Sequence, residues 1–130
     1  MLTDPIADML ARVRNASKAR HPRVEFPYSR VKEDVLKVLY EHRFIRGFAR
    51  LGDKKPVLRV ALRYGRDEMP MITGLKRIST PGRRVYADRE RLVNYGRRLG
   101  VTIVSTSKGV LPHTEALKQG VGGEILFQVW

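Results

Sequence analysis

The segment Ser105-Thr106-Ser107-Lys108-Gly109 brings three hydroxyl groups, an ammonium group and a glycine together. It lies between the apolar runs 101–104 and 110–111, so we expect a turn between two short strands. Hydroxyl groups donate and accept hydrogen bonds, and they therefore suit sugars, base edges and phosphate oxygens. Serine, threonine and glycine are also common in ordinary turns. Taken alone, the segment fits either an RNA-reading loop or a plain turn.

A basic run covers residues 76–98, where lysine and arginine far outnumber acidic residues and Arg83 and Arg84 are adjacent. Such a run is usually a solvated face of the protein. This one also contains Tyr86, and an aromatic ring is a common platform for an unpaired base. The alternative for Tyr86 is a core tyrosine with a solvated hydroxyl, and the residues alone favour that role.

Three glycines precede Glu124 in the segment Gly120-Val121-Gly122-Gly123-Glu124. Glycines allow a backbone to approach a ligand closely or to adopt positive φ. A helix end followed by a tight turn explains Gly120 fully, but it explains Gly122 and Gly123 less well. The carboxylate of Glu124 has two candidate roles, which are to accept a hydrogen bond from a base amino group and to hold a neighbouring cation.

Composition indicates a polyanionic partner. The chain has 130 residues, of which 42% are hydrophobic, and 26 basic residues against 13 acidic ones give a formal net charge of +13. The hydrophobic fraction is sufficient for a real core, and the charge is typical of nucleic-acid binding. The chain contains no cysteine, no signal peptide is recognisable, and no run approaches the roughly 20 apolar residues that span a bilayer. We therefore expect a cytoplasmic protein. Peripheral membrane binding is the alternative, but the basic residues are scattered along the chain rather than gathered on one amphipathic helix, so we expect no membrane partner.

An enzyme has little support in the residues. Ser105 and Lys108 formally fit the Ser-x-x-Lys tetrad of penicillin-recognising acyl enzymes, but the partner motifs of that class are absent. The histidines, His21, His42 and His113, are dispersed and lack metal-ligand spacing. We expect no catalytic residue, no metal site and no cofactor.

Periodicity predicts an α+β fold with two small domains, residues 1–65 and 71–130. The first is an α-β-α-β-β unit, with apolar stripes at Ile6, Met9, Leu10 and Val13 and at Val31, Val35, Val38 and Leu39. Its first helix presents Arg14 and Asn15 near an exposed polar face, where they either are simply solvated or face RNA. The second domain is mostly β with short helices: strands at 72–79, 85–86, 101–104, 110–111 and 124–130, and helices at 88–97 and 114–120.

Four separated motifs resemble the bacterial family of small-subunit ribosomal protein eight. They are Thr3 to Leu10 with Arg12 to Ala16, Ile78 to Tyr86, Ser105 to Gly109, and Gly120 to Glu124 with the terminal Val129-Trp130. Their order along the chain makes the resemblance much more specific than any single motif. Thr80 and Leu117 depart from it, because the family commonly has basic residues there, and we assign these two positions no contact.

The resemblance implies a ribosomal protein that binds the central domain of small-subunit ribosomal RNA, helps its assembly and touches neighbouring ribosomal proteins. In some bacteria the family also represses its own operon through an RNA mimic, which makes operon mRNA a second candidate partner. The implied contacts in the C-terminal domain are made by Tyr86, the loop 105–109 and the segment Gly122-Gly123-Glu124. Those in the N-terminal domain lie near Thr3, Arg14 and Asn15.

Overall fold

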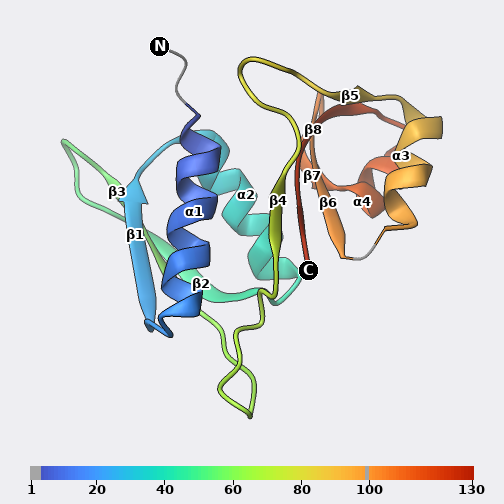
Figure 1. The fold of residues 1–130 in the computed structure, drawn as a ribbon. Coiled ribbons are helices and arrows are strands. Elements are labelled where there is room, and N and C mark those ends of the chain that lie inside the picture. Colours follow the sequence, from blue (N-terminus) through green and yellow to red (C-terminus); the bar gives the residue numbers. More distant parts are fainter. Residues whose placement is uncertain (1–3, 99) are drawn as a thin grey trace. The chain divides into compact units, whose positions relative to one another are not determined.

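The computed structural model describes residues 4–98 and 100–130, and the chain divides into two compact units. One unit comprises residues 5–73, and the other comprises Asp4 with residues 74–130. Each unit combines helices with an antiparallel sheet (Figure 1), so the predicted α+β class is confirmed. The limits of the two domains, 1–65 and 71–130, stay a prediction.

The N-terminal unit has the predicted α-β-α-β-β order. Its elements are α1 (Pro5–Lys18), β1 (Arg23–Pro27), α2 (Arg30–Glu41), β2 (Ile45–Leu51) and β3 (Val57–Leu62). The strands form an antiparallel sheet in the order β1-β3-β2. Leu58, Val60 and Leu62 alternate with more exposed residues along β3, which buries one face of the sheet.

The helices of this unit pack through apolar stripes. In α1 the predicted Met9, Leu10 and Val13 are buried. In α2 the side chain of Ser29 accepts a hydrogen bond from the Lys32 amide, so Ser29 caps the helix.

The predicted stripe of α2 is wrong at one position. Val31 is 42% exposed, whereas Lys32 and Leu36 are buried in its place. The Lys32 ammonium donates to the carbonyl of Pro27 at 2.9 Å, and its burial lowers the pKa of Lys32. Hydrophobic periodicity missed this lysine because it treats every lysine as exposed, whereas the Pro27 carbonyl gives this ammonium a partner.

The C-terminal unit is a five-stranded sheet with two short helices. Its elements are β4 (Leu75–Arg77), β5 (Tyr86–Ala87), α3 (Arg89–Gly96), β6 (Val101–Thr106), β7 (Gly109–Pro112), α4 (His113–Gln119) and β8 (Gly123–Val129). The side chain of Asp88 caps α3. Left-handed Gly120, with φ of 68°, ends α4 as predicted. The predicted strand 72–79 is shorter in the structure, where β4 covers only Leu75–Arg77. Ile72 is buried, but it lies before the residues that pair with β8.

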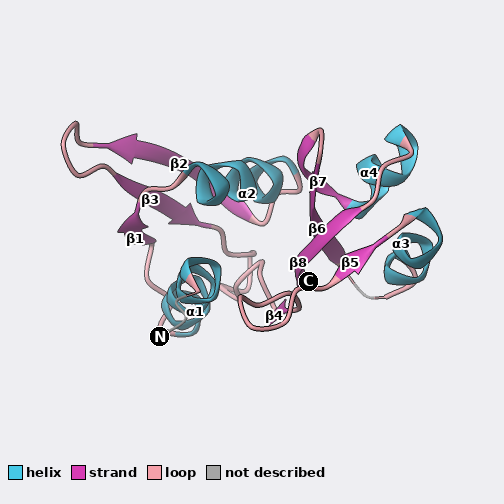
Figure 2. Ribbon diagram, turned by 90° about the horizontal axis from the view of Figure 1, so that it is seen from above, coloured by secondary structure: helices cyan, strands magenta, loops and turns pink. Residues whose placement is uncertain are grey.

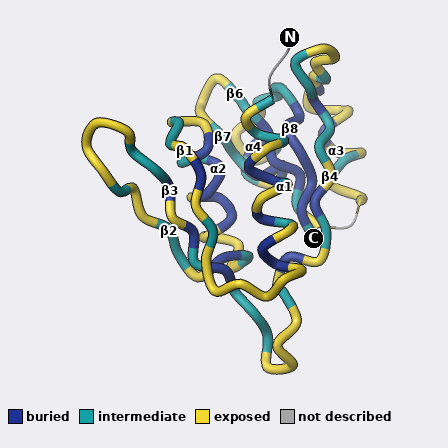
Figure 3. Tube along the Cα trace, turned by 60° about the vertical axis from the view of Figure 1, so that its left-hand side comes forward, coloured by how far each residue is buried: buried dark blue, intermediate teal, exposed yellow. Residues whose placement is uncertain are grey.

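Strand β8 is central in the sheet. It pairs with β4, β5 and β6, and Ile125 to Val129 are all buried. Figure 3 shows the dark blue of buried residues along much of β8. Leu92 of α3 and Ala116 of α4 pack with Ala87, Val104 and Ile125 in one hydrophobic cluster. Both helices therefore cover the same face of this sheet (Figure 2), and the other face does not carry them.

Candidate nucleic-acid interface

One cross-strand row brings together residues from three of the sequence motifs. Glu124 of β8 pairs with Tyr86 of β5 and with Ser105 of β6, and Ser105 also pairs with Val110 of β7. Residues directly opposite one another in antiparallel strands share a face of the sheet. Their neighbours Ala87, Val104 and Ile125 belong to the core beneath α3 and α4. The row thus lies on the face that these helices leave open.

Tyr86 is accessible on this face. It is 62% exposed, the largest exposed fraction among the large hydrophobic residues that the structure describes. The core role that the residues favoured for it is therefore wrong. Sequence reasoning could not decide this point, because strand alternation is hard to assign in a strand as short as Tyr86–Ala87.

The turn between β6 and β7 forms where it was predicted, and its hydroxyl groups have different roles. The Thr106 hydroxyl donates to the Gly109 carbonyl at 2.8 Å and accepts from the Lys108 amide at 3.0 Å. Gly109 has φ of 107°, a conformation that favours glycine. Thr106 and Gly109 therefore shape the turn, while Ser107 and Lys108 are exposed on it.

Glu124 holds a neighbouring cation, which is one of the two roles considered for it. Its Oε2 atom accepts from Arg84 Nη1 at 2.9 Å and from the Ser79 hydroxyl. The Glu124 side chain is 18% exposed and that of Arg84 is 48% exposed. The ion pair therefore lies at the surface beside the row, and it joins the basic turn to β8.

Gly122 and Gly123 are crowded by the protein itself. A Cβ atom at Gly122 would lie 2.3 Å from the Ala87 carbonyl oxygen, and one at Gly123 would lie 2.1 Å from the Ser105 carbonyl oxygen. Strand packing is thus sufficient to explain why both positions are glycine. Their contact with RNA stays a prediction that concerns the backbone.

The basic residues of 76–98 are not equivalent. Arg83 and Arg84 are exposed near the row. Arg77, in contrast, is engaged internally: its guanidinium pairs with Asp4 at 3.1 Å and donates to the Leu126 carbonyl at 2.6 Å. Counting charges along the sequence could not separate this structural arginine from the exposed ones.

The other predicted contacts lie elsewhere or are not described. Arg14 and Asn15 are in α1 of the N-terminal unit, where Asn15 is exposed and Arg14 is half-buried. Thr3 lies outside the described residues. The structure therefore groups Tyr86, Ser105 and Glu124 in one row, with the turn 106–109 at the strand ends, and it leaves the α1 residues in a separate unit.

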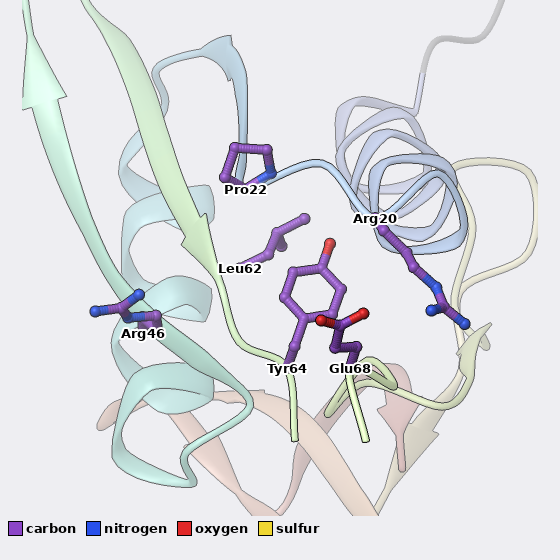
Figure 4. Close-up of a pocket in the computed structure, with 6 residues that line it drawn as sticks. All are labelled: Arg20, Pro22, Arg46, Leu62, Tyr64 and Glu68. Carbon is purple, nitrogen blue, oxygen red and sulfur yellow. The ribbon is translucent and has the colours of Figure 1, made fainter. Parts of the chain in front are cut away.

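The N-terminal unit has a pocket that contains none of the predicted site residues. Arg20, Pro22, Arg46, Leu62, Tyr64 and Glu68 line it (Figure 4), and its volume is about 380 Å³. The Tyr64 hydroxyl donates to the His21 carbonyl at 2.5 Å, and burial raises the pKa of Tyr64. These contacts give Tyr64 a structural role.

An open sheet face with an exposed aromatic ring, paired hydroxyl and carboxylate groups and a basic rim fits recognition of nucleic acid. The family model described as "Ribosomal protein S8" matches residues 4–130. The chain belongs to the ribosomal protein S8 family.

Full-length relatives support the assignment to the ribosomal protein S8 family. The chain is 50% identical over 130 residues to "Small ribosomal subunit protein uS8" of Acholeplasma laidlawii, covering 100% of this chain and 99% of the relative. It is 48% identical to the proteins of that name from Caldicellulosiruptor bescii and Staphylococcus aureus, with at least 97% of each chain covered. The predicted resemblance to this family is thereby confirmed, and with it the localisation to the ribosome.

Among residues 4–98 and 100–130, no group of three or more His, Asp or Glu side chains could hold a metal ion. No helix in these residues is long and apolar enough to cross a membrane. His113, which had no predicted role, is buried and accepts from the Thr102 amide through Nδ1 at 3.0 Å.

Proposed function

We propose that this protein is a non-catalytic structural constituent of the small ribosomal subunit that binds the central domain of its ribosomal RNA and helps that domain to assemble. The observation that carries the proposal is the row Tyr86–Glu124–Ser105, which opens beside the basic turn 83–84 and the exposed Lys108. Neighbouring small-subunit proteins are its other partners, and its own operon mRNA is a second candidate RNA.

The proposed division of labour follows from exposure and bonding. Tyr86 stacks on an unpaired base, because its ring is exposed. Ser105 and Ser107 contact sugars and base edges, whereas Thr106 keeps the turn in shape. Lys108, Arg83 and Arg84 neutralise phosphates. Arg14 and Asn15 of the N-terminal unit add contacts that the family resemblance implies, and the resemblance implies a further contact at Thr3.

A general polycation is the competing function, since a formal net charge of +13 alone would attract any nucleic acid. It predicts similar affinity for structured RNA and for duplex DNA. The row argues against it, because the exposed ring of Tyr86 can stack on an unpaired base, which structured RNA offers and a duplex does not.

The test compares Ser107→Ala with Thr73→Ala, which removes an exposed hydroxyl in the N-terminal unit. Binding to a central-domain fragment and to scrambled RNA is measured for both variants at one salt concentration. Ser107→Ala should weaken the cognate complex by about 1 kcal/mol and leave the scrambled complex unchanged, while Thr73→Ala changes neither. Equal weakening of both RNAs by Ser107→Ala would contradict the proposal.

A further inference from the structure

Ser79 is the buried centre of the contacts that hold the basic turn 80–84. It is 0% exposed, although it is polar and lies next to an exposed, strongly basic segment. Its hydroxyl donates to Oε2 of Glu124 and accepts from the Val85 amide at 3.1 Å. A serine hydroxyl has one donor hydrogen, and here that hydrogen is used by Glu124.

The two ends of the turn meet at one residue of β8. The Ser79 amide donates to the Ile125 carbonyl at 3.0 Å, and the Ile125 amide donates to the Val85 carbonyl at 2.8 Å. Within the turn, Thr80 and Arg83 exchange two backbone hydrogen bonds of 3.0 Å. Backbone hydrogen bonds to Ile125 thus hold the two ends of the segment 79–85 together. The Ser79 hydroxyl links these ends to the carboxylate of Glu124, which precedes Ile125 in β8.

One carboxylate oxygen of Glu124 accepts hydrogen bonds from both Ser79 and Arg84. Because Oε2 of Glu124 accepts from the Ser79 hydroxyl, the carboxylate cannot rotate freely to follow the arginine. Arg84 contributes only Nη1 to this pair, and in residues 4–98 and 100–130 no other hydrogen bond of its guanidinium is seen. A guanidinium has five N–H donors, so donors remain for a phosphate group.

We propose that Ser79 is a positioning residue for RNA recognition. Its hydroxyl orients the Glu124 carboxylate, which holds Arg84 so that the guanidinium meets the phosphate of a nucleotide whose base stacks on Tyr86. Glu124 pairs in register with Tyr86, so one carboxylate connects the cation to the stacking ring. The proposal rests on the proposed RNA-binding function, and it adds a buried residue to the exposed ones assigned there.

The test is a double-mutant cycle on the full chain, read out as affinity for the central-domain fragment and for scrambled RNA. Ser79→Ala and Glu124→Ala should each weaken the cognate complex by about tenfold, and the double variant should be no weaker than Glu124→Ala alone. The matched control is Ser79→Ala combined with Ser107→Ala, whose effects should multiply. Multiplicative effects of Ser79→Ala and Glu124→Ala would overturn the proposal.

A second measurement distinguishes the proposed positioning role of Ser79 from a purely structural role. All affinities are measured well below the lowest melting temperature, and the Nε–Hε signal of Arg84 is followed by NMR. That signal should shift in Ser79→Ala and remain in place in Ser107→Ala. If Ser79→Ala does not fold, Glu124→Ala decides, because unchanged cognate affinity in this variant would overturn the proposal.

The same measurements distinguish a failure of the proposed function from a failure of this inference. If the wild-type protein binds the cognate and scrambled fragments equally, the RNA-reading function itself is wrong. If the wild type discriminates between them but the cycle is multiplicative, only the role of Ser79 is wrong.

Discussion

Tyr86 of β5 and Ser105 of β6 both pair with Glu124 of β8, so an aromatic ring and a hydroxyl-bearing residue flank one carboxylate on a single sheet face. The three residues are distant in sequence and come from three different motifs. Their convergence follows from the central position of β8, which pairs with both other strands. The sheet thus supplies a rigid platform for the proposed RNA contacts.

The exposed ring of Tyr86 should contribute to binding without contributing much to stability. Tyr86→Ala should weaken the cognate RNA complex by about 1–3 kcal/mol, the usual contribution of a base stacked on an aromatic side chain. Its melting temperature should stay near that of the wild type, because the ring is 62% exposed. Fluorescence titration and thermal denaturation measure the two effects.

Tyr40→Ala provides the control for Tyr86→Ala. Tyr40 is 49% exposed on α2 of the N-terminal unit and has no proposed contact with RNA. Its replacement should leave the affinity unchanged. A similar loss of affinity in both variants would show that stacking on Tyr86 is not the cause.

Removal of different hydroxyl groups from the segment 105–109 should have different effects on stability and on RNA affinity. Thr106→Ala removes the donor to Gly109 and the acceptor for Lys108, so it should lower the free energy of unfolding by about 1 kcal/mol and disorder the turn. Ser107→Ala should leave stability unchanged and reduce only cognate affinity. Denaturant unfolding of both variants checks this difference, and equal stability losses would contradict it.

Gly123 should tolerate a side chain less well than Gly109. A Cβ atom at Gly123 would lie 2.1 Å from the Ser105 carbonyl oxygen, so Gly123→Ala must displace β8 from β6 and should cost about 1–3 kcal/mol. A Cβ atom at Gly109 would have no atom within 4 Å other than those of its chain neighbours. Only the φ of 107° at Gly109 opposes alanine, at a cost of about 1 kcal/mol. Thermal denaturation of the two variants ranks them, and the reverse order would contradict this account.

Tyr64 should make the N-terminal unit sensitive to alkaline pH. Burial raises the pKa of Tyr64, so the unfolded chain releases this proton first as pH rises. The contribution of Tyr64 is therefore complete below about pH 10 and is lost as pH rises through the higher folded pKa. Lys32 acts with the opposite sign, because burial lowers its pKa and stability is gained as pH approaches the ordinary lysine value.

Tyr64→Phe isolates the tyrosine, since Lys32 is present in both proteins. The variant should lose stability at neutral pH because the bond to the His21 carbonyl is removed. Its difference from the wild type should then shrink above about pH 10. Urea unfolding between pH 8 and pH 11 measures the difference, and a constant difference would contradict the account.

Much of the fold could be predicted from the sequence because its signals are local. The helix end at Gly120 and the final strand are each predicted by a local sequence signal, and the structure confirms both. Lys32 was missed because its burial depends on the Pro27 carbonyl from the preceding strand. Such a partner is invisible to helical periodicity.

The candidate site could be predicted only as a set of motifs. Motif order indicated the family and the residues, but the pairing of Tyr86 and Ser105 with Glu124 depends on strand register. Ser79 and Arg77 had no assigned role, because their partners, Glu124 and Asp4, lie far away in the sequence. Their roles arise from tertiary contacts and could not be inferred from composition.

The most direct test of the central claim is binding of the full chain to a central-domain ribosomal RNA fragment, titrated across salt concentrations beside scrambled RNA and duplex DNA. Each neutralised phosphate should contribute a slope of about −0.7 to −0.9 in log affinity against log salt. Only the cognate complex should remain tight at the higher salt concentrations, since stacking and hydroxyl contacts persist there. Equal binding to all three nucleic acids, abolished equally by salt, would contradict specific recognition.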